Sequence, residues 1–107
     1  MFIQLKNKPG FQIVEGYSAK AVHTNQLSVM HVSVKAGAPL PEHHHPHEQI
    51  TNIIEGKLEM TVGGVTKVCE PGDVVVILSN VPHSAVAITD CQVIDVFNPP
   101  REDLKYK

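Results

Sequence analysis

The sequence predicts an all-β fold, and three observations carry that prediction. No stretch of the 107 residues repeats apolar positions at helical spacing. Short runs of β-type composition recur instead, and Gly, Pro and Asn separate them. The expected strands are residues 11–14, 26–34, 49–55, 57–62, 65–69, 74–78, 83–88 and 92–97. About eight closely spaced strands predict a closed or double-sheet β architecture.

Individual strands carry their own signals. In 26–34, Met30, Val32 and Val34 alternate with the residues between them, so they share one face. Gly63-Gly64 separates two apolar runs and predicts a two-residue hairpin turn. Residues 74–78 form a continuous apolar run between Pro71-Gly72-Asp73 and Ser79-Asn80. Pro99-Pro100 ends the last strand, because proline donates no backbone hydrogen bond.

Length and composition restrict the organisation and the partners. The 107 residues fit one domain, 1–107, and 42% apolar residues suffice for a core. Charged residues make up 19% and the net charge is −2, so neither nucleic acid nor an anionic membrane is expected as a partner. No apolar run reaches membrane-spanning length, and residues 1–10 lack the apolar region of a signal peptide. Cys69 and Cys91 lie in unrelated contexts, which favours free thiols and a cytoplasmic location.

A histidine cluster occupies residues 43–47, where four of the seven histidines fall. Three nearby prolines argue against a helix, and on an extended chain His43 and His45 share a face. Two imidazoles on one face favour a transition-metal site, which Gln49 and Thr51 can join. The alternatives are a chelating surface tract or a solvated polar loop. His44 and His47 are expected at the surface, and His23 and His31 as structural residues.

The last expected strand and the residues after it contain further candidates. Val93, Asp95 and Phe97 alternate and therefore share a face. Asp95 either points inward, as a general acid or base candidate, or faces water at the strand surface. Phe97 by itself is typical of a core residue. Arg101 is the only arginine, and it can bind a substrate carboxylate or pair with Glu102, Asp103 or another surface acid.

Two motifs resemble those of the cupin family. The first runs from Gly37 through His43-x-His45 and Gln49 to Gly56, and the second from Gly72-Asp73 to Pro82-His83. Leu78, Asn80 and Ala87 depart from the usual pattern, and Asn80 tolerates the left-handed backbone of the usual glycine. The resemblance implies a single cupin domain, a double-stranded β-helix or jelly-roll barrel. It also implies one divalent transition metal ion (Ni, Zn, Mn or Fe) bound by His43, His45, Gln49 and His83.

The segment from Asp95 to Asp103 looks like the C-terminal signature of the KdgF-type pectin-degradation cupins, and so does the glutamine in the metal set. This resemblance implies conversion of 4,5-unsaturated monouronates, from pectin or alginate breakdown, to linear ketonised sugar acids. It assigns the reaction site to Asp95, Arg101 and Phe97. It implies a redox-neutral enzyme with a small anionic sugar-acid substrate, and the family expectation is a homodimer.

Three other functions stay open on the sequence. A cupin dioxygenase with iron would also use histidines on one face, but it would consume oxygen. Another metal-dependent sugar-acid isomerase would use the same residues and form a different product. A non-enzymatic cupin would bind a small acid without converting it.

Overall fold

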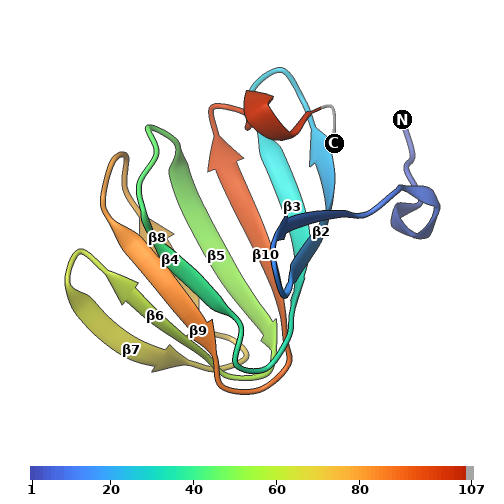
Figure 1. Cartoon of the computed structure of the whole chain (residues 1–107). Helices are drawn as coiled ribbons and strands as arrows, with labels where there is room; N and C mark the ends of the chain where they lie inside the picture. Colours follow the sequence, from blue (N-terminus) through green and yellow to red (C-terminus); the bar gives the residue numbers. More distant parts are fainter. Residues whose placement is uncertain (106–107) are drawn as a thin grey trace.

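The structure, a computed structural model, describes residues 1–105, which fold into two antiparallel sheets that face each other (Figure 1). The six-stranded sheet has the order β1-β2-β3-β10-β5-β8, and the four-stranded sheet has the order β4-β9-β6-β7. The strands are β1 (Phe11–Val14), β2 (Tyr17–His23), β3 (Ser28–Val34), β4 (Pro39–His43), β5 (Glu48–Glu55), β6 (Leu58–Val62), β7 (Val65–Cys69), β8 (Val74–Ile77), β9 (His83–Ala87) and β10 (Cys91–Asn98). Two short 3-10 helices, η1 (Leu5–Asn7) and η2 (Glu102–Leu104), flank them. The expected all-β jelly roll is confirmed.

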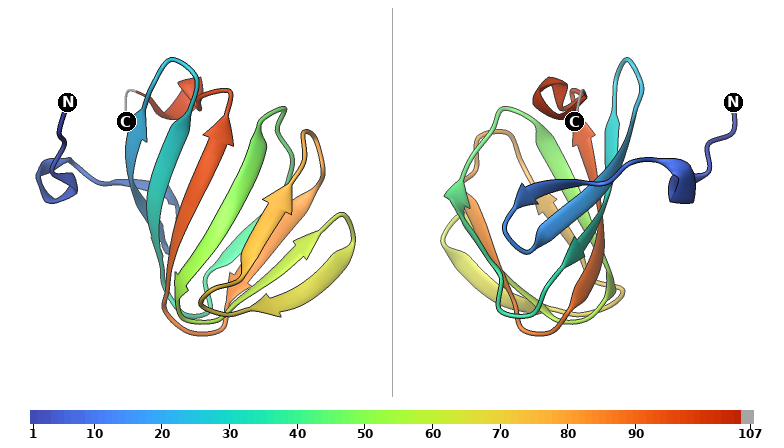
Figure 2. Two further views of the ribbon diagram at one scale, coloured as in Figure 1. Left: turned by 180° about the vertical axis from the view of Figure 1, so that it is seen from behind. Right: turned by 45° about the vertical axis from the view of Figure 1, so that its right-hand side comes forward.

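The core lies between the sheets and follows the alternation of the strands. Met30, Val32 and Val34 on β3 are each at most 3% exposed, whereas Ser33 between them is exposed. Both cysteines, Cys69 and Cys91, are buried and unpaired, as expected. Figure 2 shows that the sheets approach each other at one end and spread apart at the other, where η2 lies.

Two strands, β2 and β4, were not predicted from the sequence. In β2, the inward positions after Tyr17 are Ala19 and Ala21, and alanine carries little β propensity. Prolines occupy β4, but this strand is the edge of its sheet, where a missing backbone N–H is tolerated. The two-residue hairpin is confirmed, because β6 pairs with β7 across Gly63-Gly64 and both glycines have positive φ.

The outer face of the six-stranded sheet carries exposed apolar side chains on β5 and its edge neighbour β8. Ile50, Ile54, Val74 and Val76 are between 42% and 58% exposed, and Ile50 pairs with Val76 across the strands. The apolar run expected at 74–78 is therefore only half buried, with Ile77 turned inward. No helix within residues 1–105 combines the length and apolar composition needed to cross a membrane.

Gly56, between β5 and β6, lies against the turn that leads into β10, and replacing it should test how tightly this end of the barrel is packed. It has a φ of +84°, and a Cβ there would collide with the Asp90 carbonyl oxygen and crowd Thr89 and Cys91. Gly64 has a similar φ of +82° but open space around it. We expect Gly64→Ala to cost about 1 kcal/mol of unfolding free energy from strain alone, and Gly56→Ala about 2 kcal/mol more. Urea unfolding of both variants measures this, and equal losses would contradict the tight packing at Gly56.

Candidate metal centre

Three histidine rings converge at the wide end of the barrel. His43 ends β4 and His83 begins β9, and the two are direct cross-strand partners. His45 follows in the connection to β5. One ring nitrogen from each histidine lies within 4.8 Å of the others. His83 is only 3% exposed and the other two rings are half-buried, so the cluster lies within the barrel wall, unlike a solvated loop.

Backbone carbonyls determine which nitrogen of each ring faces the cluster. Each Nδ1 lies within hydrogen-bond distance of a carbonyl oxygen two residues away, which can only accept, so Nδ1 carries the proton. The pairs are His43 with Pro41 at 2.8 Å, His45 with His47 at 3.1 Å and His83 with Val81 at 2.9 Å. In the neutral rings, Nε2 is then the unprotonated nitrogen, with a free lone pair. This is the arrangement of metal-binding histidines, whose other nitrogen is held by a hydrogen bond.

Two further observations fit a cation at this point. Nε2 of His83 is buried and has no hydrogen-bond partner. Nε2 of His45 lies 3.1 Å from Oε1 of Gln49, so two electron-rich atoms face each other when the His45 proton is on Nδ1. A positive ion between them would satisfy both atoms. Burial holds the pKa of His45 and of His83 below the usual range, and neighbouring positive groups add to this effect. The rings are therefore kept neutral, as metal binding requires.

A hydrogen-bonded chain connects the cluster to Asp95. Gln49 donates from Nε2 to Thr51 Oγ1 at 2.9 Å, and Thr51 donates to Asp95 Oδ1 at 2.7 Å. With Asp95 ionised, the single Thr51 hydroxyl proton goes to the carboxylate, so the amide of Gln49 must donate and its oxygen faces the histidines. The register of β5 against β10 produces this chain, because Thr51 is directly opposite Asp95 and Gln49 opposite Phe97.

Asp95 points into the barrel, which decides the alternative that the sequence left open. It is half-buried and lines the barrel cavity. Burial raises the pKa of Asp95 from 3.8 to about 6, and the hydrogen bonds from Thr51 and Gln49 and the charge of Arg101 oppose this rise. A carboxyl group with a pKa near 6 can exchange a proton at neutral pH in both directions.

Arg101 lies on the rim of the same cavity, just before η2. Its Nε and Nη2 donate to the two carboxylate oxygens of Asp103, at 3.1 and 2.9 Å. Its guanidinium carbon lies 4.9 Å from the centre of the Phe97 ring. Phe97 is only 2% exposed, and its ring also meets His45 edge-on with a centroid distance of 5.8 Å. Arg101 therefore pairs with an acid and also lines the cavity.

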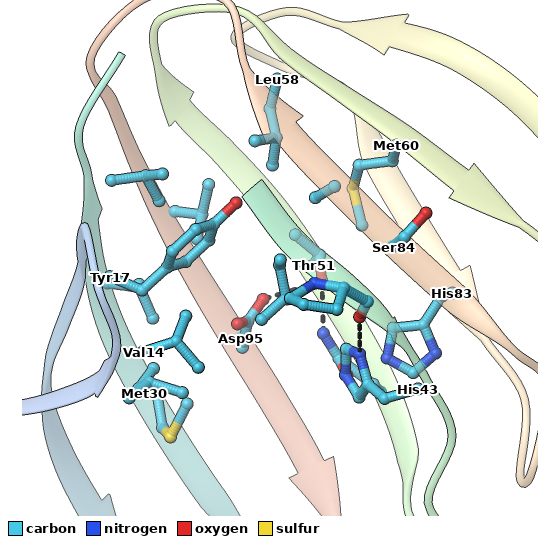
Figure 3. Close-up of a pocket in the computed structure, with 18 of the residues that line it drawn as sticks. Val14, Tyr17, Met30, His43, Thr51, Leu58, Met60, His83, Ser84 and Asp95 are labelled. Carbon is cyan, nitrogen blue, oxygen red and sulfur yellow. Dashed lines mark hydrogen bonds between the residues drawn. The ribbon is translucent and has the colours of Figure 1, made fainter. Parts of the chain in front are cut away.

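The cavity has a volume of about 360 Å³, near the lower end for small-molecule sites. One side carries the polar groups, and Figure 3 shows Asp95 beside Thr51, with the rings of His43 and His83 beyond them. The inner wall is apolar, and its residues include Val14, Met30, Val32, Leu58, Met60 and Val93. Tyr17 also lines the cavity, but its hydroxyl donates to the Ala38 carbonyl and burial raises its pKa to about 12. It is therefore unsuited to proton transfer at neutral pH.

The seven residues singled out from the sequence thus surround one cavity or support its wall. His44 is exposed, as expected, but the expectation for His47 was wrong, because its ring is half-buried and meets Phe97 edge-on at 6.4 Å. Ser28 was not predicted from the sequence, but it is fully buried and accepts a hydrogen bond from the backbone N–H of Arg101 at 2.7 Å. No local signal points to that contact, since 73 residues separate the two.

Comparison with known proteins agrees with this geometry. The cupin domain family matches residues 30–97, which is more than half of the chain. The pectin degradation protein KdgF of Dickeya dadantii (strain 3937) is 28% identical over 98 residues, which cover 89% of each protein. The structure of KdgF from Halomonas sp. superimposes with a TM-score of 0.91 and 31% identity, covering 97% of both chains. An RmlC-like cupin from Shewanella frigidimarina gives a TM-score of 0.90 and 30% identity, covering 95% of this chain and 93% of that one.

The matched family segment begins on β3 and ends at Phe97, so it contains all three converging histidines. The two expected motifs lie inside it. The chain belongs to the cupin family and is a KdgF-type cupin with three histidines positioned to bind a metal ion.

Proposed function

We propose that this protein is a metal-dependent, redox-neutral enzyme that opens 4,5-unsaturated monouronates to linear ketonised sugar acids. The observation that carries the proposal is the meeting of three groups at one cavity: the histidine cluster, the buried carboxyl of Asp95 and the lone guanidinium of Arg101. The names of the KdgF relatives support a role in pectin breakdown. The cavity volume of about 360 Å³ suits a monosaccharide better than a polymer.

In this proposal, His43, His45, His83 and the oxygen of Gln49 hold one divalent transition metal ion. All four groups are neutral, so an ion held there would keep its charge of about +2 and would polarise oxygen atoms of the substrate. Arg101 binds the substrate carboxylate with the guanidinium donors that Asp103 leaves free. Phe97 lies beneath Arg101 and beside His45, so its proposed part is to hold both groups and keep water out.

Asp95 moves the proton in the proposed reaction. As the carboxylate, it accepts the proton of the C1 hydroxyl while the bond between C1 and the ring oxygen breaks, which gives an aldehyde at C1 and an enolate at C5. It then returns that same proton to C4, and the enolate oxygen becomes the ketone oxygen at C5. Atoms and electrons balance, and no redox cofactor is needed. A pKa of about 6 suits a group that must both accept and donate a proton near neutral pH.

A second candidate function follows from the apolar inner wall of the cavity. Six of its residues offer no hydrogen bond to sugar hydroxyls. This favours a small carboxylic acid with an apolar body, held by Arg101 at its acid end. Conversion of such an acid would include oxidative chemistry if the bound ion were iron. Oxygen consumption separates the two candidates, because uronate ring opening consumes none.

We also propose that the protein forms a homodimer through the apolar outer face of β5 and β8. Ile50, Ile54, Val74 and Val76 lie together on adjacent strands at one edge of the six-stranded sheet. Clustered exposed apolar side chains are typical of protein interfaces.

The central test is turnover of purified, metal-loaded protein on unsaturated galacturonate and mannuronate-derived monomers. We expect the enol-ether absorbance to fall faster than the spontaneous rate, with no oxygen uptake. Chelation should abolish the acceleration, and returning the metal should restore it. No acceleration with any of Ni, Zn, Mn or Fe would refute the proposed function, and oxygen uptake with an aromatic or aliphatic acid would favour the second candidate.

Gln49→Glu tests the neutral ligand set. A carboxylate binds a divalent ion at least as well as an amide, but it lowers the net charge of the site by one. We expect metal content to stay near one ion per chain while KM for the anionic substrate rises about tenfold. Metal analysis and steady-state kinetics measure both effects. Unchanged KM and kcat would contradict the importance of site charge.

Asp95→Asn tests the proton carrier. We expect kcat, measured by steady-state kinetics, to fall about 10²–10⁴-fold with metal still bound.

The same variant tests the pH dependence of stability. Folding raises the pKa of Asp95 from 3.8 to about 6, so the protonated carboxyl group stabilises the folded state at low pH. This stabilisation is lost as the pH rises from about 4 through 6. In metal-free protein the variant should therefore melt near wild type below pH 4 and several degrees higher at pH 8, a difference of about 3 kcal/mol. Bound metal should shrink this gap, because its charge favours the carboxylate.

Val76→Glu tests the dimer. The charge would lie within the proposed apolar interface, so light scattering should show monomers at concentrations where the wild type is a dimer. Val65→Glu is the matched control, since Val65 is 71% exposed on β7, which belongs to the other sheet. A wild type that is monomeric, or a Val76→Glu variant that remains dimeric, would contradict this proposal.

A further inference from the structure

Arg101 is held at three points before any ligand arrives. Asp103 accepts hydrogen bonds from Nε and Nη2 on both carboxylate oxygens, which is the strong bidentate geometry. Phe97 lies under the guanidinium plane at 4.9 Å. The backbone N–H of Arg101 donates to Ser28 Oγ at 2.7 Å, and that oxygen also lies 2.7 Å from His23 Nδ1. The backbone of Arg101 therefore contacts Ser28, the edge of its guanidinium contacts Asp103, and the face of its guanidinium contacts Phe97.

The turn that carries both partners is itself anchored. Arg101 directly precedes η2, and Leu104 donates its backbone N–H to the Arg101 carbonyl at 3.0 Å. The Leu104 side chain is only 7% exposed, so this 3-10 turn is packed onto the barrel. Asp103 therefore meets Arg101 from a defined position, although its own side chain is 58% exposed.

The donor count of the guanidinium shows what Asp103 leaves available. An arginine side chain has five N–H donors, and the bidentate pair with Asp103 occupies two of them. Both hydrogens of Nη1 and one of Nη2 remain, and they form the second fork of the guanidinium. Arg101 lines the cavity whereas Asp103 does not, so Asp103 occupies the outer fork.

Asp95 is a second carboxylate that lines the cavity together with Arg101. The positive charge of Arg101 acts on the pKa of Asp95, so the two groups are electrostatic neighbours across the cavity. An untethered arginine would be drawn onto Asp95, which would bury both functional groups in one ion pair. Asp103, lying on the outer side, provides a competing partner that keeps them apart.

We infer that Asp103 is a positioning residue, which holds the Arg101 guanidinium at the cavity rim with its free fork ready for a ligand carboxylate. Because the side chain is ordered on folding, less conformational freedom is lost when the ligand binds. The inference rests on the proposed function only for the identity of that ligand, an unsaturated monouronate.

The first test needs no substrate. Arg101 is the only arginine in the chain, so its Nε–H gives a single side-chain signal in a ¹⁵N NMR spectrum. A proton held by a carboxylate is protected from exchange with water. We expect Asp103→Ala to speed this exchange at least about tenfold, and Asp103→Glu to restore part of the protection. Glu102→Gln is the matched control, because Glu102 pairs with Lys105 at 3.0 Å and should leave the signal unchanged.

Equal exchange in wild type and Asp103→Ala would overturn the inference, as would an equal effect of Glu102→Gln. Both outcomes are independent of whether the protein turns over any uronate, so they are distinguishable from failure of the proposed function. That failure would appear separately, as wild-type protein without turnover.

The second test is a double-mutant cycle in steady-state kinetics on an unsaturated monouronate. We expect Asp103→Ala to raise KM about tenfold with a smaller fall in kcat, since binding of the carboxylate is weakened first. In an Arg101→Lys background, which has no fork to position, removal of Asp103 should change KM less than twofold. Additive effects in the two backgrounds would show that Asp103 acts through folding alone, and would overturn the inference.

Discussion

The pairing of β5 with β10 in the six-stranded sheet is the constraint on which the site depends. Their register places Gln49 opposite Phe97 and Thr51 opposite Asp95. A slip of one residue by either strand would turn that strand's two site residues to the outer face. The inward pair Ile53 and Val93, which are 2% and 5% exposed, lies on the same strands and makes that slip costly. The apolar core thus maintains the polar arrangement.

The second sheet contributes the other half of the centre. His43 and His83 meet because β4 and β9 pair at that point, where the register of the edge strand is irregular. Backbone carbonyls then hold each ring by Nδ1, so the Nε2 atoms converge. Polar groups on both sheets therefore approach one another only where the barrel opens, and the narrower interior stays apolar.

Electrostatic balance explains why these residue types occur together. Neutral imidazoles and an amide leave the charge of a bound cation uncompensated, and Arg101 adds another positive charge at the rim. Asp95 and the exposed Glu42 are acidic side chains that line the cavity with them, and burial raises the pKa of Asp95 to about 6. An anionic ligand would therefore meet the bound cation and the guanidinium of Arg101, beside a carboxyl group whose pKa lies close to neutral pH. The apolar inner wall limits how many hydroxyl groups such a ligand can place there.

The sequence by itself determined the periodicity and the local turns. Alternation predicted that Asp95 and Phe97 share a face of their strand, and that His43 and His45 share a face of their own segment. The predicted Gly63-Gly64 turn was confirmed. These features depend on neighbouring residues, so local patterns encode them. The cupin motifs brought His83 into the set through resemblance, not through any pattern near it. Only the tertiary structure decided which face points inward, and therefore that Asp95 faces the cavity.

Long-range contacts decided the rest. The pairing of the edge strand β4 explains how its prolines are tolerated, and packing against Phe97 buried half of His47. The sequence left open whether Arg101 binds a substrate carboxylate or pairs with an acid. In the structure it pairs with Asp103 and also lines the cavity. Ser28 reaches it across 73 residues, a contact with no local trace. The physical reason is that composition and spacing determine which residues form a strand and which of them share a face. The partners of those residues across sheets and turns are selected only when the whole core packs.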